Sequence, residues 1–113
     1  MISKLPVLNV YKKKTKKTKV VTQLLYGDTF KQLRGKNSWI KIKNNLDNYI
    51  GYIKNAKFSK NHKNTHKVSV LYSNLYLKAN NKNKIKKKLS FGSKIKVTNK
   101  KGDFYKFDNL WIK

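Results

Sequence analysis

Few residues of this sequence could carry out acid–base or nucleophilic chemistry. There is no cysteine, and only two histidines, His62 and His66, are present. The acidic residues are four aspartates, namely Asp28, Asp47, Asp103 and Asp108. A hydrolase needs a nucleophile near a base, or two carboxylates facing one substrate. Because every aspartate lies beside turn residues and both histidines lie in or next to a polar stretch, we interpret the aspartates as turn formers and the histidines as solvated spacers. We predict no catalytic activity for this chain.

Cofactor chemistry has equally little support. No pair of His and Asp residues has the spacing of metal ligands, and no glycine-rich phosphate-binding loop is present. We therefore expect no metal and no cofactor.

Four aromatic residues are the best candidates for ligand contact: Tyr26, Trp39, Tyr49 and Tyr52. On a small barrel such rings can line a shallow groove and stack on a peptide or a sugar. Trp39 occupies an alternating position that also suits core packing, and both interpretations stay open. Tyr49 lies next to a turn, which favours ligand contact.

The charge of the chain points to anionic partners. The formal net charge is +25, and Arg34 is the only arginine among the cations. Nucleic acid, an acidic lipid surface and an anionic cell-wall polymer are all attracted at low salt. Lysine, asparagine and isoleucine have AT-rich codons, so genome composition explains part of this charge. Aromatic and lysine residues also interleave, as on platforms for single-stranded nucleic acid, at Tyr11-Lys12, Tyr52-Ile53-Lys54 and Tyr105-Lys106.

The chain repeats itself. At an offset of 65 residues Asn9-Val10-Tyr11 aligns with Asn74-Leu75-Tyr76, and Tyr26-Gly27 aligns with Phe91-Gly92. Later the offset becomes 59, which places Tyr52-Ile53 on Trp111-Ile112. We predict two domains, residues 1–59 and 66–113, joined by a polar linker at residues 60–65.

The apolar residues of each unit recur with a period of two and are separated by turn residues such as Gly27-Asp28 and Lys101-Gly102-Asp103. This pattern predicts about five short strands per unit and an all-β fold of small barrels. The lysine runs of residues 12–19 and 82–88 are predicted to be exposed loops, although residues 84–89 could also form an amphipathic helix.

Two strings carry a family resemblance. The first runs from Val21 to Phe30 and continues through Trp39-Ile40-Lys41-Ile42 to Asp47-Asn48-Tyr49-Ile50-Gly51-Tyr52. The second runs from His66 through Leu89-Ser90-Phe91-Gly92 to Trp111-Ile112. They resemble the tandem bacterial SH3 domains that precede NlpC-type cell-wall cysteine peptidases of the dipeptidyl-peptidase VI kind. The resemblance implies two SH3-like barrels, with the second truncated at its C-terminal end.

The resemblance further implies a non-catalytic binding or targeting module of a peptidoglycan endopeptidase. Such a module would bind cell-wall peptide or shape the active-site rim of a following peptidase domain. We expect a monomer with no transmembrane segment, and the resemblance favours the cell envelope although no signal peptide is visible. The alternatives are a lysine-rich nucleic-acid-binding protein and a structural spacer without a ligand of its own.

Overall fold

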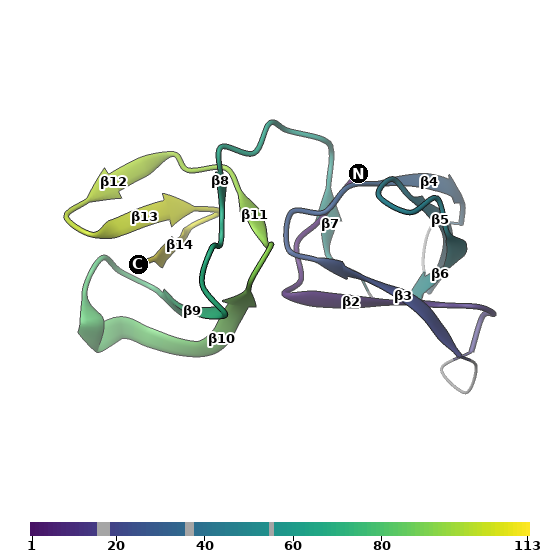
Figure 1. Cartoon of the computed structure of the whole chain (residues 1–113), viewed down its shortest axis with the longest axis horizontal. Coiled ribbons are helices and arrows are strands. Elements are labelled where there is room, and N and C mark those ends of the chain that lie inside the picture. Colours follow the sequence, from purple (N-terminus) through teal and green to yellow (C-terminus); the bar gives the residue numbers. More distant parts are fainter. Residues whose placement is uncertain (16–18, 36–37, 55) are drawn as a thin grey trace. The chain divides into compact units, whose positions relative to one another are not determined.

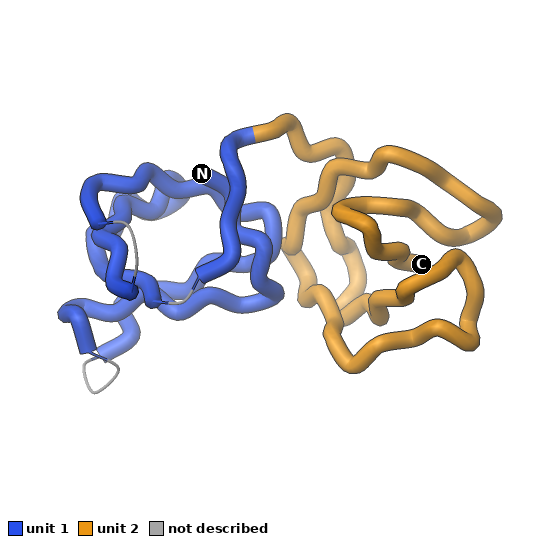
Figure 2. Tube along the Cα trace, turned by 180° about the vertical axis from the view of Figure 1, so that it is seen from behind, with its two compact units in different colours: residues 1–61 blue, residues 62–113 orange. Residues whose placement is uncertain are grey.

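The computed structural model describes residues 1–15, 19–35, 38–54 and 56–113. The chain forms two compact units, Met1–Asn61 and His62–Lys113, which have different colours in Figure 2. Figure 1 labels most of the strands of both.

The first unit contains seven strands among its described residues. They are β1 (Ile2–Ser3), β2 (Val7–Tyr11), β3 (Val20–Leu25), β4 (Phe30–Arg34), β5 (Trp39–Asn44), β6 (Ile50–Lys54) and β7 (Phe58–Ser59). Five of them form an antiparallel sheet in the order β3-β2-β6-β5-β4, and β1 pairs with β7. Alternate side chains point to one face and form the core, which consists of Leu8, Val10, Leu24, Phe30, Ile40, Ile42 and Ile53.

The second unit has the same order of strands. Its strands are β8 (His66–Lys67), β9 (Tyr72–Tyr76), β10 (Lys84–Ser90), β11 (Lys94–Ile95), β12 (Asn99–Lys101), β13 (Phe104–Phe107) and β14 (Leu110–Ile112), with a short 3-10 helix, η1, at Asn81–Asn83. The sheet runs β10-β9-β14-β13-β12, and β11 pairs with β8. Leu75, Leu89, Phe107 and Ile112 are among its buried residues.

The two units share a turn that joins the third strand to the next. Gly27 and Gly92 lie in this turn with φ angles of 84° and 91°, a conformation that glycine adopts without steric cost. The amide of Gly27 donates to the carbonyl of Ser3, and the amide of Gly92 donates to the carbonyl of Val68. The sequence repeat is therefore also a repeat of backbone hydrogen bonds.

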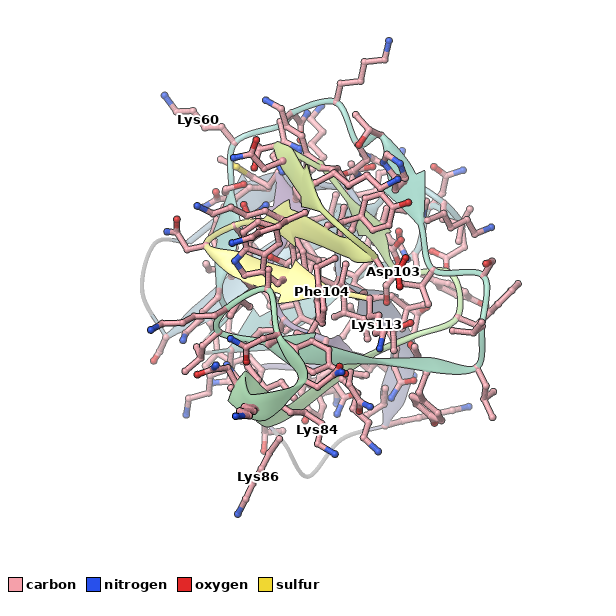
Figure 3. The ribbon with its side chains drawn as sticks, turned by 90° about the vertical axis from the view of Figure 1, so that its left-hand side faces the viewer. Lys60, Lys84, Lys86, Asp103, Phe104 and Lys113 are labelled. Carbon is pink, nitrogen blue, oxygen red and sulfur yellow. The ribbon has the colours of Figure 1, made fainter. Side chains whose placement is uncertain are left out.

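The fold prediction is confirmed: the chain is all-β, with two five-stranded sheets consistent with two SH3-like small barrels. The prediction of a loop at the second lysine run is wrong. Residues Lys84–Ser90 form β10, which pairs with β9, and Leu89 is fully buried. One buried leucine and a backbone ladder hold this strand in place, while its lysines remain in solvent, as Lys86 does in Figure 3.

The first lysine run lies partly outside the described residues, because Lys16, Lys17 and Thr18 are not among them. In the part of this run that is described, Lys12 donates its amide to the carbonyl of Lys19, 3.0 Å away, immediately before β3. Among the described residues, no helix is long and apolar enough to cross a membrane.

Candidate functional site

The strand register of the first unit aligns a row of polar and aromatic residues. Arg34 is the partner of Lys41, Lys41 of Tyr52, and Tyr52 of Tyr11, across β4, β5, β6 and β2. Direct cross-strand partners share a face of the sheet, and the core residues alternate onto the other face. The row therefore lies on the outer face of the barrel.

Trp39 completes this surface, which we call the outer aromatic cluster and define as Tyr11, Trp39 and Tyr52. The rings of Tyr11 and Trp39 meet edge to face, with centroids 5.8 Å apart and an interplanar angle of 87°. All three residues are only partly buried, so they retain surface for a ligand. Edge-to-face packing holds the rings in place without covering both of their faces.

Cations lie directly over these rings. The Nζ atom of Lys54 is 5.4 Å from the Trp39 centroid, and that of Lys14 is 5.7 Å from the Tyr52 centroid. Lys54 is also the cross-strand partner of Trp39. A ligand that offers an apolar face and a carboxylate would meet both a ring and an ammonium group here.

The hydroxyl of Tyr52 is electrostatically perturbed. A hydrogen bond with the Arg34 side chain lowers the pKa of Tyr52 below its usual value of 10.0, and the charges of Lys41, Arg34 and Lys14 act in the same direction. Desolvation opposes this change. The group that favours the phenolate is thus the single arginine of the chain.

The four residues predicted to contact a ligand occupy different places. Trp39 and Tyr52 lie together in the outer aromatic cluster. Tyr49 lies in the turn between β5 and β6 and is 54% exposed. Tyr26 lies in the turn after β3, is only 6% exposed, and has the Lys4 ammonium 5.5 Å from its ring centroid.

Sequence reasoning did not select Tyr11, Arg34 or Lys41 as part of this ligand site. Tyr11 was apparent only as part of an alternating aromatic–lysine pattern. The sequence does not reveal the strand register that brings these residues together. The register of β4 against β5 is irregular between Gln32 and Arg34, and this irregularity brings Arg34 opposite Lys41. Irregularities of this kind redirect a side chain without a clear sequence mark.

The second unit repeats the cluster in a more buried form. Tyr76 is the cross-strand partner of Trp111, and Trp111 is that of Lys106. Tyr76 and Phe104 meet edge to face at 5.1 Å and 89°, and both are buried. The Nζ atom of Lys113 lies 5.6 Å from the Phe104 centroid and donates to Asn81 Oδ1 at 3.3 Å; Figure 3 labels Lys113 and Phe104. Of these two clusters, the one in the first unit is therefore the more accessible.

The residues considered for catalysis have structural contacts. Asp28 accepts from the amide of Leu25 at 2.8 Å, and Asp47 accepts from the amide of Tyr49 at 3.1 Å, as expected of turn formers. His66 lies in β8 with its ring 5.4 Å from that of Tyr105. Within the described ranges, no cluster of three His, Asp or Glu side chains could hold a metal ion.

Comparison with known protein families gives a match for most of the first unit. Residues 6–59 match the family described as Bacterial SH3 domain. A comparison with curated proteins finds no match. The matched residues span β2 to β7 and therefore include the whole outer aromatic cluster. The first unit thus contains a bacterial SH3 domain, a non-catalytic type of module, which suggests a binding or targeting role for the chain.

Proposed function

We propose that this chain is a targeting module that binds cell-wall peptide through the outer aromatic cluster of its first unit. The observation that carries the proposal is the pairing of partly exposed rings with fixed cations on one face of the sheet. Stem peptides of peptidoglycan combine aliphatic side chains with free carboxylates. The rings would cover the aliphatic parts, and Lys41, Lys54 or Arg34 would pair with the carboxylates.

The individual residues have distinct roles in this proposal. Trp39 and Tyr52 are the main contacts because they share a face and flank the cations. Tyr49 extends the contact from the neighbouring turn. Tyr26 supports the turn after β3, since its ring is too buried to offer much surface to a ligand.

The module would hold an NlpC-type peptidase on the wall or shape the rim of its active site. The bacterial SH3 match of the first unit and the resemblance of both units to the SH3 region of such enzymes support this role. Reading the gene downstream of the codon for Lys113 tests it directly. An open frame that encodes a cysteine and two histidines in an NlpC-like domain is expected, and a stop codon would argue against it.

Binding is tested with purified peptidoglycan and soluble muropeptides, by co-sedimentation and calorimetry. We expect Trp39→Ala and Tyr52→Ala each to weaken binding by roughly tenfold, as for central aromatic contacts in other interfaces. Tyr72→Ala is the matched control, because Tyr72 is a tyrosine of the second unit that is 61% exposed and lies outside the cluster. Equal binding by all three variants would contradict the proposed site.

Nucleic-acid binding is the second candidate, and the net charge of +25 with recurring lysine–aromatic pairs favours it. Bases would stack on the same rings while lysines neutralise phosphates. Fluorescence anisotropy with a labelled single strand, measured over a salt series, separates the two functions. Tight binding that falls steeply with salt, together with no affinity for muropeptides, would replace the cell-wall proposal.

A further inference from the structure

The outer face of β5 carries one aromatic ring and two cations in line. Burial alternates along this strand, and its three partly exposed residues are Trp39, Lys41 and Lys43. Successive residues on one face of a strand lie about 6.8 Å apart. The outer face of β5 therefore presents a ring, a cation and a second cation at regular spacing.

The neighbouring strand β4 adds a cation opposite each of these lysines. Lys31 is the cross-strand partner of Lys43, and Arg34 is that of Lys41. We call these four residues the basic square. Like charges directly opposite each other destabilise a sheet, and both aspartates of the first unit lie in the connections between strands rather than in these two rows. The basic square therefore costs stability that a bound anion would restore.

The second unit shows that the fold does not require these charges. The sequence repeat with an offset of 65 residues aligns Arg34 with Asn99 and Lys43 with Asp108. Asn99 pairs with Lys106 across β12 and β13, as Arg34 pairs across β4 and β5. The same hairpin is thus built with an amide and an acid at two of the four positions. Packing of the barrel does not explain the basic square.

Strand β6 borders the basic square with apolar surface. Tyr52 is the partner of Lys41, and Ile50, which is 52% exposed, is the partner of Lys43. An acidic side chain ends in a charge on an apolar stem, so β6 would cover the stem while the cations hold the carboxylate. A phosphodiester chain carries charge along its whole backbone and gains less from such a border. The surroundings of the square therefore favour carboxylates.

We propose that the first unit binds an extended peptide along β5, with an apolar side chain on Trp39 and carboxylates two and four residues further along the peptide. The first carboxylate meets Lys41 and Arg34, and the second meets Lys43 and Lys31. Alternate side chains of an extended chain share a face at the spacing of β5, so the pattern apolar-x-acid-x-acid matches the ring and the cations in register. The inference rests on the proposed function and specifies the charge pattern of its ligand.

The test is a titration of the isotope-labelled full chain at low ionic strength, followed by amide chemical shifts. The probe is acetylated and amidated Phe-Ser-Glu-Ser-Glu, with its reversed sequence for the opposite chain direction. The control peptide, Phe-Ser-Glu-Glu-Ser, has the same composition and charge, but its second glutamate falls on the other face. We expect the better of the two in-register peptides to bind about fivefold more tightly than the control, the weight of one exposed ion pair. Shift changes should be confined to β4, β5 and β6.

Two matched variants locate the second carboxylate. Lys43→Gln should give the in-register and control peptides equal affinity, whereas Lys96→Gln, at the counterpart of Lys31 in the second unit, should keep the difference. Both variants remove one positive charge. Because Lys43→Gln also removes a like-charge pair, its urea midpoint should be no lower than that of the unchanged chain, which separates loss of binding from loss of folding.

Equal affinity of the in-register and control peptides for the unchanged chain would overturn the inference, because net charge alone would then explain binding. Tighter binding of a single-stranded oligonucleotide that Lys43→Gln weakens would also overturn it and assign the basic square to phosphates. The proposed function has a separate readout. If Trp39→Ala weakens muropeptide binding while the two peptides bind equally, only the charge pattern is wrong. If neither muropeptides nor peptides bind, both proposals fail.

Discussion

Replacing Gly51 with alanine should destabilise the first unit by about 1–3 kcal/mol, the usual cost of overpacking an already packed site. A Cβ atom at this position would lie 2.6 Å from Val10 Cγ1 and 2.7 Å from the Tyr11 carbonyl oxygen. Favourable carbon contacts lie near 3.5–4.0 Å, so each overlap approaches 1 Å. The Val10 side chain could rotate, but the Tyr11 carbonyl belongs to the backbone, and relief there requires β2 and β6 to separate.

This cost is large for so small a unit. A domain of the size of Met1–Asn61 has a stability of about 3–9 kcal/mol at ordinary values per residue. Each kcal/mol corresponds to about 4–8 °C in Tm at this size. The register between β2 and β6 consists of the single pair Tyr11 and Tyr52, so separating the strands should also disturb the outer aromatic cluster. Gly51→Ala should therefore weaken ligand binding as well as stability.

The chain provides its own spectroscopic reporters, because its two tryptophans, Trp39 and Trp111, belong to different units. Urea unfolding of Gly51→Ala is followed by Trp39 fluorescence in a Trp111→Phe background. The control is Gly102→Ala, read by Trp111 in a Trp39→Phe background. Gly102 has a φ of 58° and no atom within 4 Å of an added Cβ, so only the left-handed backbone costs energy there, about 1 kcal/mol. An unchanged urea midpoint for Gly51→Ala would refute the packing argument.

Two further predictions concern polar groups. Arg34→Gln should raise the pKa of Tyr52 toward 10.0, as measured by the absorbance of tyrosinate at alkaline pH with Tyr52→Phe as the blank. Because folding lowers the pKa of Tyr52, ionised Tyr52 stabilises the folded first unit; this contribution is fully present above pH 10.0 and is lost as pH falls through the lowered pKa. An unchanged pKa of Tyr52 in the Arg34→Gln variant would contradict the hydrogen bond between the two side chains. Asp28→Ala should cost about 1 kcal/mol, since the Leu25 amide loses its hydrogen-bond acceptor. Ser93→Ala at the equivalent turn should be neutral or stabilising, because the buried Ser93 hydroxyl has no hydrogen-bond partner among the residues that the structure describes. Equal losses in urea unfolding of these two variants would show that the turns do not differ in this way.

The fold was predictable because the two-residue period of apolar positions indicates strands, and the sequence repeat places the same strands in both units. Val10 and Ile42 are buried and alternate with less buried neighbours, and their counterparts in the second unit, Leu75 and Phe107, are buried as well. The strand at Lys84–Ser90 was not predictable from its composition, because the strand is held by pairing with β9 rather than by its own residue preferences. The linker at residues 60–65 stays a prediction.

The candidate site was predictable only in part. Residue type and position were enough to single out Trp39 and Tyr52, but their ligand roles stay predictions. Tyr26 shows why type alone is insufficient, since a tyrosine beside a turn glycine can direct its ring inward. Arg34 joins the row only through the irregular register of β4, which depends on tertiary pairing.

The pairing of β1 with β7 also affects how fast the first unit can fold. Ile2 and Ser59 lie at almost opposite ends of that unit, whereas in the second unit β8 pairs with β11 near the middle of its sequence. Contacts between residues far apart in sequence slow folding, because a long loop must close before they form. When the first unit refolds, the pairing of β1 with β7 should therefore form late, after short-range contacts such as those between β2 and β3.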